Sequence, residues 1–536
     1  MAVGNEQVLA TTAQELVEYA TRHHLIEAAD RIWAYNAVLA AVDAEGPAAP
    51  RPWTQPADED QPADQDADGL TLDDLLNTLV HHALMNGVIE RSPSACDALA
   101  CQVMGALTPR PSEVARQFHA LESARGPKAA TDWFYALCCA NGYVRQSASA
   151  RNIKWKTPTT WGDLEITINL SKPEKDPRAI ARAGAAPQDG ERYPACQLCI
   201  ENEGYAGRGD DSPRGAHPAR QNLRIVPLEL GGERWGLQYS PYAYFGEHCI
   251  AMSAAHRPMH IDRATVSNLL ELVDLLPHYF FGSNADLPIV GGSILSHDHF
   301  QGGAHEFAMM RAATAWTFAM DAFPDVSAEV LHWPLSVIRL RTRSREQALD
   351  AAVHVIDLWR GWSSEAAGVI AAGTDGTPHN TVTPVVRRVG EAGQPGGAIY
   401  EVYLALRCNV TSEEHPLGVF HPHAQYHHIK RENIGLIEVM GLAILPPRLS
   451  RELAEVSRLL EAGQLDALDA NPLTASHAAW ARVVAARRGA DVAAGKADAV
   501  LQDEVGQVFS HVLEDAGVFK WNEAGEQAFH AFTNSL

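Results

Sequence analysis

The chain has 536 residues, of which 46% are hydrophobic and 20% are charged. This length allows a sizeable core and three to four domain-sized units at roughly 150 residues each, and the composition is that of a globular protein. Lys and Arg number 43 against 66 Asp and Glu, a net charge of −23. So acidic a chain argues against nucleic acid and against an anionic membrane as partners.

Location and redox state follow from what the sequence lacks. No apolar run reaches the ~18 residues that cross a bilayer. The first residues have no basic start followed by an apolar stretch, so we expect no secretory signal. Eight cysteines in 536 residues do not make a disulfide scaffold. We therefore expect a soluble, cytoplasmic protein.

The first 150 residues are predicted to be mostly helical, because apolar residues recur at spacings of three and four. This pattern is interrupted near residues 45–70 by a stretch rich in Pro, Asp and Ala with almost no large aliphatic residues. Such a composition is typical of an acidic, disordered surface insertion.

From about residue 151 the pattern changes to alternating apolar and polar residues, which predicts strands. We expect one amphipathic helix over 264–282, a buried strand over 287–295, and an Ala-rich helical region from about 447. Other predicted strands or buried segments lie at 162–174, 221–230, 234–245, 248–253, 335–342, 398–410 and 435–445. The fold class is thus α+β with helical ends, and similar element orders in 152–310 and 330–445 permit a duplicated module.

The strongest functional signal is DLPIVGGSILSHDHFQGGAHEF, residues 286–307. It carries His297, His299 and Gln301 between two Gly-Gly pairs. Residues two apart in an extended segment share a face, so the two imidazoles and the amide would project together. Neighbouring glycines let backbone N–H groups approach anionic oxygens. The pattern suits either a metal or a phosphoryl group.

A second signal is the Cys-x-x-Cys element of Cys196 and Cys199. It can present two thiolates to one cation. A redox pair is the alternative, but no thioredoxin-like context surrounds the element. His256 and His297 are the candidates that would complete a tetrahedral zinc site.

A third signal, residues 420–433, contains His421, His423, His427 and His428. His421-Pro-His423-Ala-Gln425 also spells His-x-His-x-Gln, so two candidate centres compete. We favour the first because it follows a predicted buried strand, is framed by glycines, and lies nearer to the cysteine pair. The second could bind substrate or a second metal, or it could form a polar edge.

The run DLPIVGGSILSHDHFQGG closely resembles the signature of the second class of galactose-1-phosphate uridylyltransferases, in the histidine-triad superfamily. Residues 150–450 carry the resemblance. Further similar segments are RNIKWKTPTTWGDLEITINLSKPEKDP, CQLCIENEGYAGR, HPARQNLRIVPLEL, GEHCIAMSAAHRPMHID, HNTVTPVVRR and FHPHAQYHHIKRENIGLIEVMGLAILP.

The resemblance implies two histidine-triad-like halves with antiparallel sheets, at 151–310 and 311–450, between helical regions at 1–150 and 451–536. It implies transfer of UMP from UDP-glucose to galactose 1-phosphate by ping-pong through a uridylyl-histidine, as in Leloir galactose metabolism. It also implies a homodimer and no organic cofactor beyond the covalent UMP.

Carried over by motif, the resemblance makes His299 the nucleophile and Gln301 the ligand of the phosphoryl oxygens. A zinc of mainly structural role would be held by Cys196, Cys199, His256 and His297. This sequence has Asp298 where the better-known class has Pro. Asn222 and Asn284 would contact the nucleotide, and Ser293 or Ser296 could donate to the phosphate.

The chemistry is consistent with this assignment, because a neutral imidazole can attack phosphorus and the resulting phosphoramidate is labile. Gln301 donates a hydrogen bond but does not titrate, whereas a histidine there would favour hydrolysis. Two alternatives stay open. One is a histidine-triad nucleotide hydrolase or phosphorylase. The other is a non-catalytic zinc-binding module that docks through its acidic insertion at 57–74.

Overall fold

The computed structural model describes residues 2–44, 50–53, 70–170, 193–209, 212, 214–292, 294–390 and 397–536. Most of the predicted insertion near 45–70 lies outside these residues, as does Ser293. The chain divides into two compact units. The first comprises Met1–Ser147, Gln188–Ala243 and Cys249–His256, and the second comprises Ala148–Pro187, Tyr244–His248 and Arg257–Leu536.

The first unit combines helices with an antiparallel three-strand segment. Its helices are α1 (Ala2–Arg22), α2 (Arg31–Ala41), α3 (Leu72–Met85), α4 (Pro93–Ala106), α5 (Pro111–Arg125) and α6 (Pro127–Ala140). These helices confirm the prediction for the first 150 residues. A capping box begins α3, in which the Thr71 hydroxyl accepts from the Asp74 amide and the Asp74 carboxylate accepts from the Thr71 amide.

The strands of the first unit are β3 (Val226–Leu230), β4 (Glu233–Tyr239) and β5 (Cys249–Ser253), paired in that order. All three confirm predicted strands. Helix α6 packs against β4: the Tyr239 hydroxyl donates to the Thr131 carbonyl at 3.0 Å, and the rings of Phe134 and Tyr239 lie 5.2 Å apart. The short helix α7 (Gln146–Ala150) follows where the chain passes to the second unit.

The second unit contains seven neighbouring antiparallel strands in the order β7-β6-β11-β12-β10-β9-β8. They are β7 (His299–Gly303), β6 (Phe280–Gly282), β11 (Asn380–Val389), β12 (Ile399–Cys408), β10 (Val337–Thr342), β9 (Ser327–Leu331) and β8 (Thr314–Phe318). A smaller sheet has the order β1-β2-β13, from Ile153–Thr159, Gly162–Ile168 and Leu442–Leu445.

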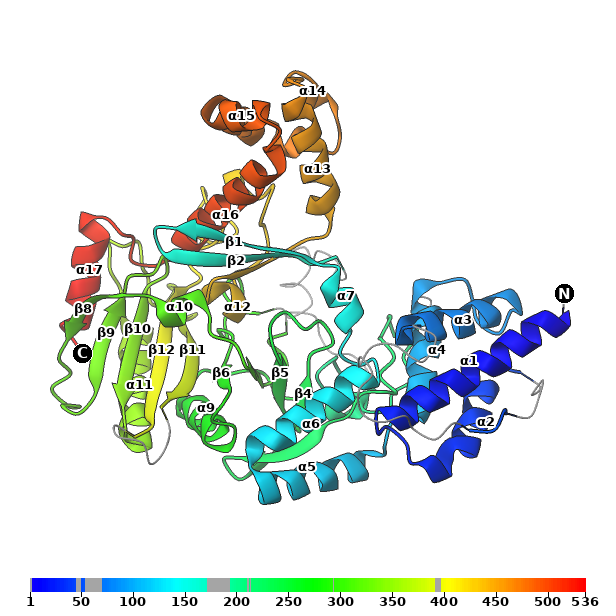
Figure 1. Ribbon diagram of the computed structural model, residues 1–536. Helices are drawn as coiled ribbons and strands as arrows, with labels where there is room; N and C mark the ends of the chain where they lie inside the picture. The colour runs from blue at the N-terminus through cyan, green and yellow to red at the C-terminus, as the bar shows by residue number, and fades with distance from the viewer. Residues whose placement is uncertain are drawn as a thin grey trace. The chain divides into compact units, whose positions relative to one another are not determined.

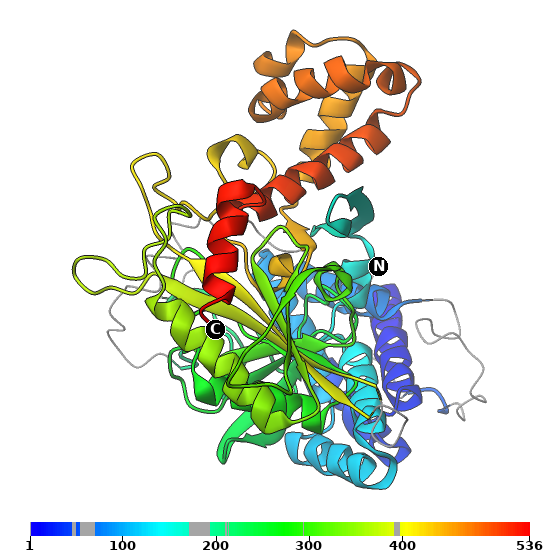
Figure 2. The ribbon, with the colours of Figure 1, turned by 90° about the vertical axis from the view of Figure 1, so that its left-hand side faces the viewer.

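Helices cover the strands of the second unit. Helix α11 (Arg345–Gly361) lies against β10, β11 and β12 (Figures 1 and 2), and helix α9 (Arg263–Leu275) lies against β6 and β11. Toward the C-terminus α13 (Arg448–Glu461), α15 (Ala478–Ala493) and α16 (Ala497–Ala516) pack on one another, and α16 also contacts β1 and β2 (Figure 1). Among the described residues, the other α-helices of this unit are α10 (Ala308–Arg311), α12 (Leu436–Val439), α14 (Ala467–Ala470) and α17 (Glu523–Thr533). The Ala-rich helical end is thereby confirmed.

Two predicted elements are wrong in type or length. Residues 287–292, 294 and 295 form turns and irregular backbone instead of a buried strand, and Ile289 has a left-handed φ of 75°. The helix predicted over 264–282 ends at Leu275, and β6 follows it. Pro277 has no amide hydrogen to extend the helix, and β11 offers Phe281 a strand partner instead. Within the described ranges, no helix combines the length and the apolar character needed to cross a bilayer.

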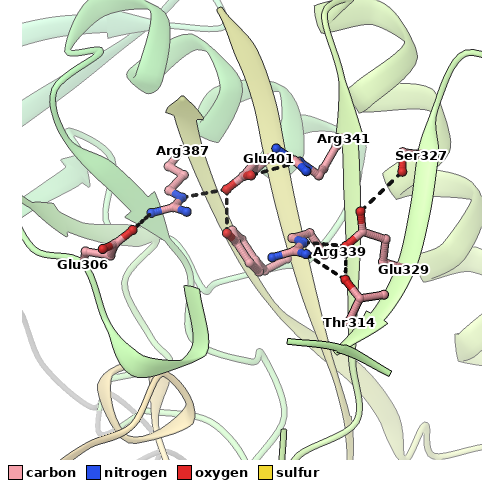
Figure 3. Close-up of polar contacts among 9 residues, drawn as sticks. Glu306, Thr314, Ser327, Glu329, Arg339, Arg341, Arg387 and Glu401 are labelled. Atoms are coloured by element: carbon pink, nitrogen blue, oxygen red, sulfur yellow. Dashed lines mark hydrogen bonds and ion pairs between the residues drawn. The ribbon is translucent and has the colours of Figure 1, made fainter. Parts of the chain in front are cut away.

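A network of charged side chains links strands β8 to β12 (Figure 3). Glu401, only 3% exposed, accepts from the Tyr403 hydroxyl at 2.6 Å and from Arg387 Nε at 2.7 Å. Burial by itself raises the pKa of the Glu401 carboxyl group. The contacts with Tyr403 and Arg387 together lower it by more, so the pKa lies below its ordinary value. The rest of the network is Glu306, Thr314, Ser327, Glu329, Arg339 and Arg341.

This network predicts a large effect of Arg387→Met on stability. The change should lower the free energy of unfolding by about 3 kcal/mol, because it leaves the buried Glu401 carboxylate without its main cationic partner. Arg311→Met is the matched control, since the Arg311–Glu306 pair is 3.9 Å long and Arg311 is 42% exposed. Arg311→Met should lower the free energy of unfolding by less than ~0.5 kcal/mol. Urea unfolding measures both, and equal losses would contradict the expectation.

Candidate active site and metal-binding cluster

The His-x-His-x-Gln motif is carried by β7 and the two residues before it. His299 and Gln301 both belong to β7, and alternation along the strand directs their side chains to the same face. Gly282 of β6 lies opposite Gln301. A Cβ at Gly302 would lie 2.4 Å from the Phe280 carbonyl oxygen, so only glycine allows β6 and β7 to approach this closely.

His299 is a buried imidazole, 6% exposed, with a defined hydrogen bond. Its Nδ1 lies 2.7 Å from the main-chain carbonyl oxygen of His297. Because the carbonyl can only accept, Nδ1 carries the proton and the lone pair resides on Nε2. The pKa of His299 is lowered to about 4, mainly by burial and also by the His297 side chain. The hydrogen bond to the His297 carbonyl opposes this shift. His299 is therefore a neutral imidazole whose Nε2 can act as a nucleophile.

Gln301 has a partner that the sequence did not indicate. Its Oε1 lies 3.0 Å from Nε2 of His248, a residue 3% exposed. His248 lies in the family-like segment GEHCIAMSAAHRPMHID, but that resemblance gave it no role. It is 53 positions from Gln301 in the chain, so motif spacing could not have linked the two residues. Asp298, between the two motif histidines, is paired with Arg257 at 3.3 Å, and burial raises the pKa of its carboxyl group.

The Cys-x-x-Cys element brings its two sulfur atoms together. Cys196 Sγ and Cys199 Sγ lie 3.6 Å apart, and Cys199 Sγ lies 3.3 Å from His256 Nδ1. His256 comes just after β5. The contact with Cys199 and then burial raise the pKa of the Cys196 thiol. A divalent cation has the opposite effect, because it stabilises the thiolate.

The ligand atoms of all four predicted metal-binding residues lie within 4.8 Å of one another; they are those of Cys196, Cys199, His256 and His297. Cys₂His₂ is a donor set that zinc prefers in tetrahedral sites. These residues could therefore hold a metal ion such as zinc. Among the residues that the structure describes, this is the one group of three or more candidate ligands.

A supporting contact around the cysteines went unpredicted. Asn202 Nδ2 donates to the carbonyl oxygens of Cys196 and Cys199, at 2.8 Å in both cases. Asn202 Oδ1 in turn lies 2.6 Å from Nε2 of His217. Burial is the largest cause that lowers the pKa of His217 to about 4, which keeps the ring neutral. These two residues fix the turn between the sulfur ligands, as outer-shell partners of metal sites do.

The other predicted binding residues have mixed surroundings. Asn284, 5% exposed, accepts from the Leu436 amide at 2.9 Å through Oδ1. Asn222, 4% exposed, donates from Nδ2 to the Asn141 carbonyl at 3.0 Å. Ser296 is half-buried, and Ser293 lies outside the described residues. The nucleotide-binding roles of these residues stay predictions.

The second His-x-His-x-Gln segment makes a different set of contacts. His421 Nε2 lies 3.3 Å from Asn433 Oδ1, and His423 Nδ1 lies 3.2 Å from Asp515. His427 contacts the Pro422 carbonyl at 2.8 Å, and His428 contacts His477 at 2.9 Å. These imidazoles are distributed among several protein partners, and Gln425 lies on no strand. This arrangement supports our preference for the first centre.

Comparisons with known proteins identify the family of the chain. Two family models match the chain: Galactose-1-phosphate uridyl transferase, N-terminal domain, at residues 65–258, and its C-terminal domain at residues 272–482. A galactose-1-phosphate uridylyltransferase of Bacillus subtilis (strain 168) is 45% identical over 525 residues, covering 98% of this chain and 97% of the relative.

Two further relatives bear the same name. That of Lactiplantibacillus plantarum is 48% identical and covers 95% of each chain. That of Lacticaseibacillus casei is 49% identical over 88% of this chain and 91% of the relative. No solved structure matches the chain significantly. With two matching family models and near-full-length relatives, this chain belongs to the galactose-1-phosphate uridylyltransferase family, a family of nucleotidyltransferases.

Proposed function

We propose that the protein transfers UMP from UDP-glucose to galactose 1-phosphate, giving UDP-galactose and glucose 1-phosphate, through a uridyl group held covalently on His299. The observation that carries this proposal is the 2.7 Å contact between His299 Nδ1 and the His297 carbonyl. It places the proton on Nδ1 and leaves Nε2 for attack on the α-phosphorus.

The two half-reactions balance around this nitrogen. In the first, Nε2 bonds to the α-phosphorus as the bond to the β-phosphate oxygen breaks, and glucose 1-phosphate leaves. In the second, a phosphate oxygen of galactose 1-phosphate attacks the same phosphorus and the P–N bond breaks. Nδ1 keeps its proton throughout, so the uridylyl-imidazole is cationic and leaves readily. The His297 carbonyl stabilises that positive charge.

Gln301 is proposed to donate from its amide to the α-phosphate oxygens, where negative charge develops. Its place beside His299 on β7 supports this role. We further propose that Asn284, Ser293 and Ser296 help to bind the nucleotide, and that Asn222 does so as the family motif implies. The four-part division of the chain, a homodimer and a cytoplasmic location also stay proposals.

For the metal, we propose one zinc held by Cys196, Cys199, His256 and His297. Four protein ligands leave no open position, so the role would be structural. His297 would then serve two purposes. Its imidazole would bind the metal, while its main-chain carbonyl orients His299. Zinc, when bound, would fix the position of the residue that orients the nucleophile.

Initial-rate kinetics test the proposed two-step transfer. UDP-galactose formation should give parallel double-reciprocal lines when UDP-glucose and galactose 1-phosphate are varied, because the first product leaves before the acceptor binds. Intersecting lines would contradict a ping-pong scheme. Rapid release of free UMP without acceptor would favour the histidine-triad hydrolase instead.

The amide of residue 301 should control loss of the intermediate to water. Gln301→His should slow transfer and raise the ratio of free UMP to UDP-galactose, because a histidine there can protonate and assist water attack. The ratio is measured with UDP-glucose and galactose 1-phosphate both present. An unchanged ratio with the adduct still forming on His299 would show that water exclusion, and not residue 301, suppresses hydrolysis.

A further inference from the structure

His248 lies against Gln301 inside an aromatic cluster of the second unit. Its Nε2 is 3.0 Å from Gln301 Oε1. The ring of Phe245 is 4.4 Å from the His248 ring, and the ring of Tyr244 is stacked on it at 5.4 Å. Packing on these rings restricts the imidazole, so the nitrogen that faces Gln301 is held in place.

The backbone of this segment is fixed to the end of β7. The Ala304 amide donates to the Gly246 carbonyl at 3.1 Å, and the Tyr279 hydroxyl donates to the Glu247 carboxylate. Gly303 has a φ of 149°, and a Cβ there would lie 2.6 Å from the Glu247 carbonyl oxygen. Only glycine permits so close an approach. His248 therefore keeps its position relative to the strand that carries both His299 and Gln301.

This contact decides which end of the Gln301 amide is available to a substrate. The oxygen and nitrogen of an amide have nearly the same shape, so a glutamine without neighbours can present either. An N–H on His248 Nε2 donates to Oε1 and thereby directs the NH₂ group away from His248. In the flipped state, Oε1 would face the anionic phosphoryl oxygens and repel them.

We propose that His248 is a positioning residue for uridylyl transfer, which orients the Gln301 amide so that its NH₂ donates to the α-phosphate. This inference rests on the proposed function, because it assumes that Gln301 contacts that phosphate. In this role His248 would act through Gln301 and not by contact with the substrate. Its effect should therefore appear only when the Gln301 amide is present.

A double-mutant cycle tests this dependence. The readout is the single-turnover rate of uridylyl-enzyme formation from UDP-glucose, together with the UDP-glucose concentration that gives half the maximal rate. We expect Gln301→Ala to slow formation by about 100-fold. His248→Phe, which keeps a flat ring but has no donor, should slow it by about 10-fold with little change in half-saturation.

Three further variants complete the design. His248→Gln places an N–H near the position of Nε2 and should restore the rate to within about threefold of the wild type. His248→Phe combined with Gln301→Ala should be no slower than Gln301→Ala alone. The matched control is His305→Phe: His305 lies in the same aromatic cluster, 5.9 Å from the Phe245 ring, but its Nε2 contacts Glu165. The control should keep the wild-type rate.

Each contrary outcome has a distinct meaning. A normal rate in His248→Phe or in Gln301→Ala would overturn the positioning role. So would a double variant whose slowing equals the product of the two single effects. If His248→Phe does not fold, His248→Met replaces it, since methionine is flexible enough to fill the same space. Failure of the proposed function is a separate result, because the wild-type protein would then form no uridylyl adduct at all.

Discussion

His299→Ala should reduce UDP-galactose formation by at least about 10⁴-fold, because it removes the atom that bonds to phosphorus. The fold should survive the change. The loss of one neutral hydrogen bond to the His297 carbonyl costs about 1 kcal/mol. Turnover assays and urea unfolding, measured on the same preparation, separate the two effects.

His423→Ala is the matched control, since His423 holds the corresponding place in the second His-x-His-x-Gln segment. It should keep its turnover and should still form the adduct. If instead His299→Ala keeps near-normal turnover and His423→Ala loses it, the nucleophile is His423. His299→Gly extends the test, because the cavity should admit added imidazole and recover part of the activity.

Cys199→Ser should lower zinc content and thermal stability together. A serine hydroxyl is a poor zinc ligand. Replacing a residue that only supports a metal ligand lowers metal affinity by about 10- to 100-fold, so replacing a ligand itself should lower zinc affinity by more. Activity should also fall, because the backbone carbonyl that accepts from His299 belongs to His297, a proposed zinc ligand. Metal analysis, thermal melting and turnover measure the three consequences.

Cys408→Ser provides the control for the second prediction. Cys408 is also a buried cysteine, fully enclosed on β12, and lies outside the metal-binding group. This variant should lose some stability. It should retain about one zinc per chain, because the proposed thiolate and imidazole ligands are unchanged. Full zinc occupancy in Cys199→Ser would refute the assignment of the ligands.

Local patterns predicted much of the fold. The strands at 226–230 and 249–253 follow from short apolar runs bounded by turn residues, and the helical ends follow from spacings of three and four. Residues 287–295 show where this approach failed. Their apolar run suggested a strand, but the Gly291 carbonyl accepts from Asn433 and Asn284 contacts Leu436. Contacts from distant residues, and the left-handed Ile289, shape this segment.

The site was predictable to the extent that it is local in sequence. Cys-x-x-Cys and His-x-His-x-Gln each place their side chains together within a few residues, so spacing alone marked them. His248, Asn202 and His217 could not be found in this way. Each is a single polar residue whose importance comes from its contacts. His248 contacts Gln301, Asn202 donates to the carbonyls of both cysteines, and His217 contacts Asn202.

The covalent intermediate is the most direct test of the central claim. The intact wild-type protein is incubated with UDP-glucose alone, its mass is measured, and the modified residue is located by peptide sequencing. We predict a mass increase of one uridylyl group on His299 that disappears when galactose 1-phosphate is added, with UDP-galactose formed in equal amount. No adduct under any quench, or an adduct on His423, would contradict this account.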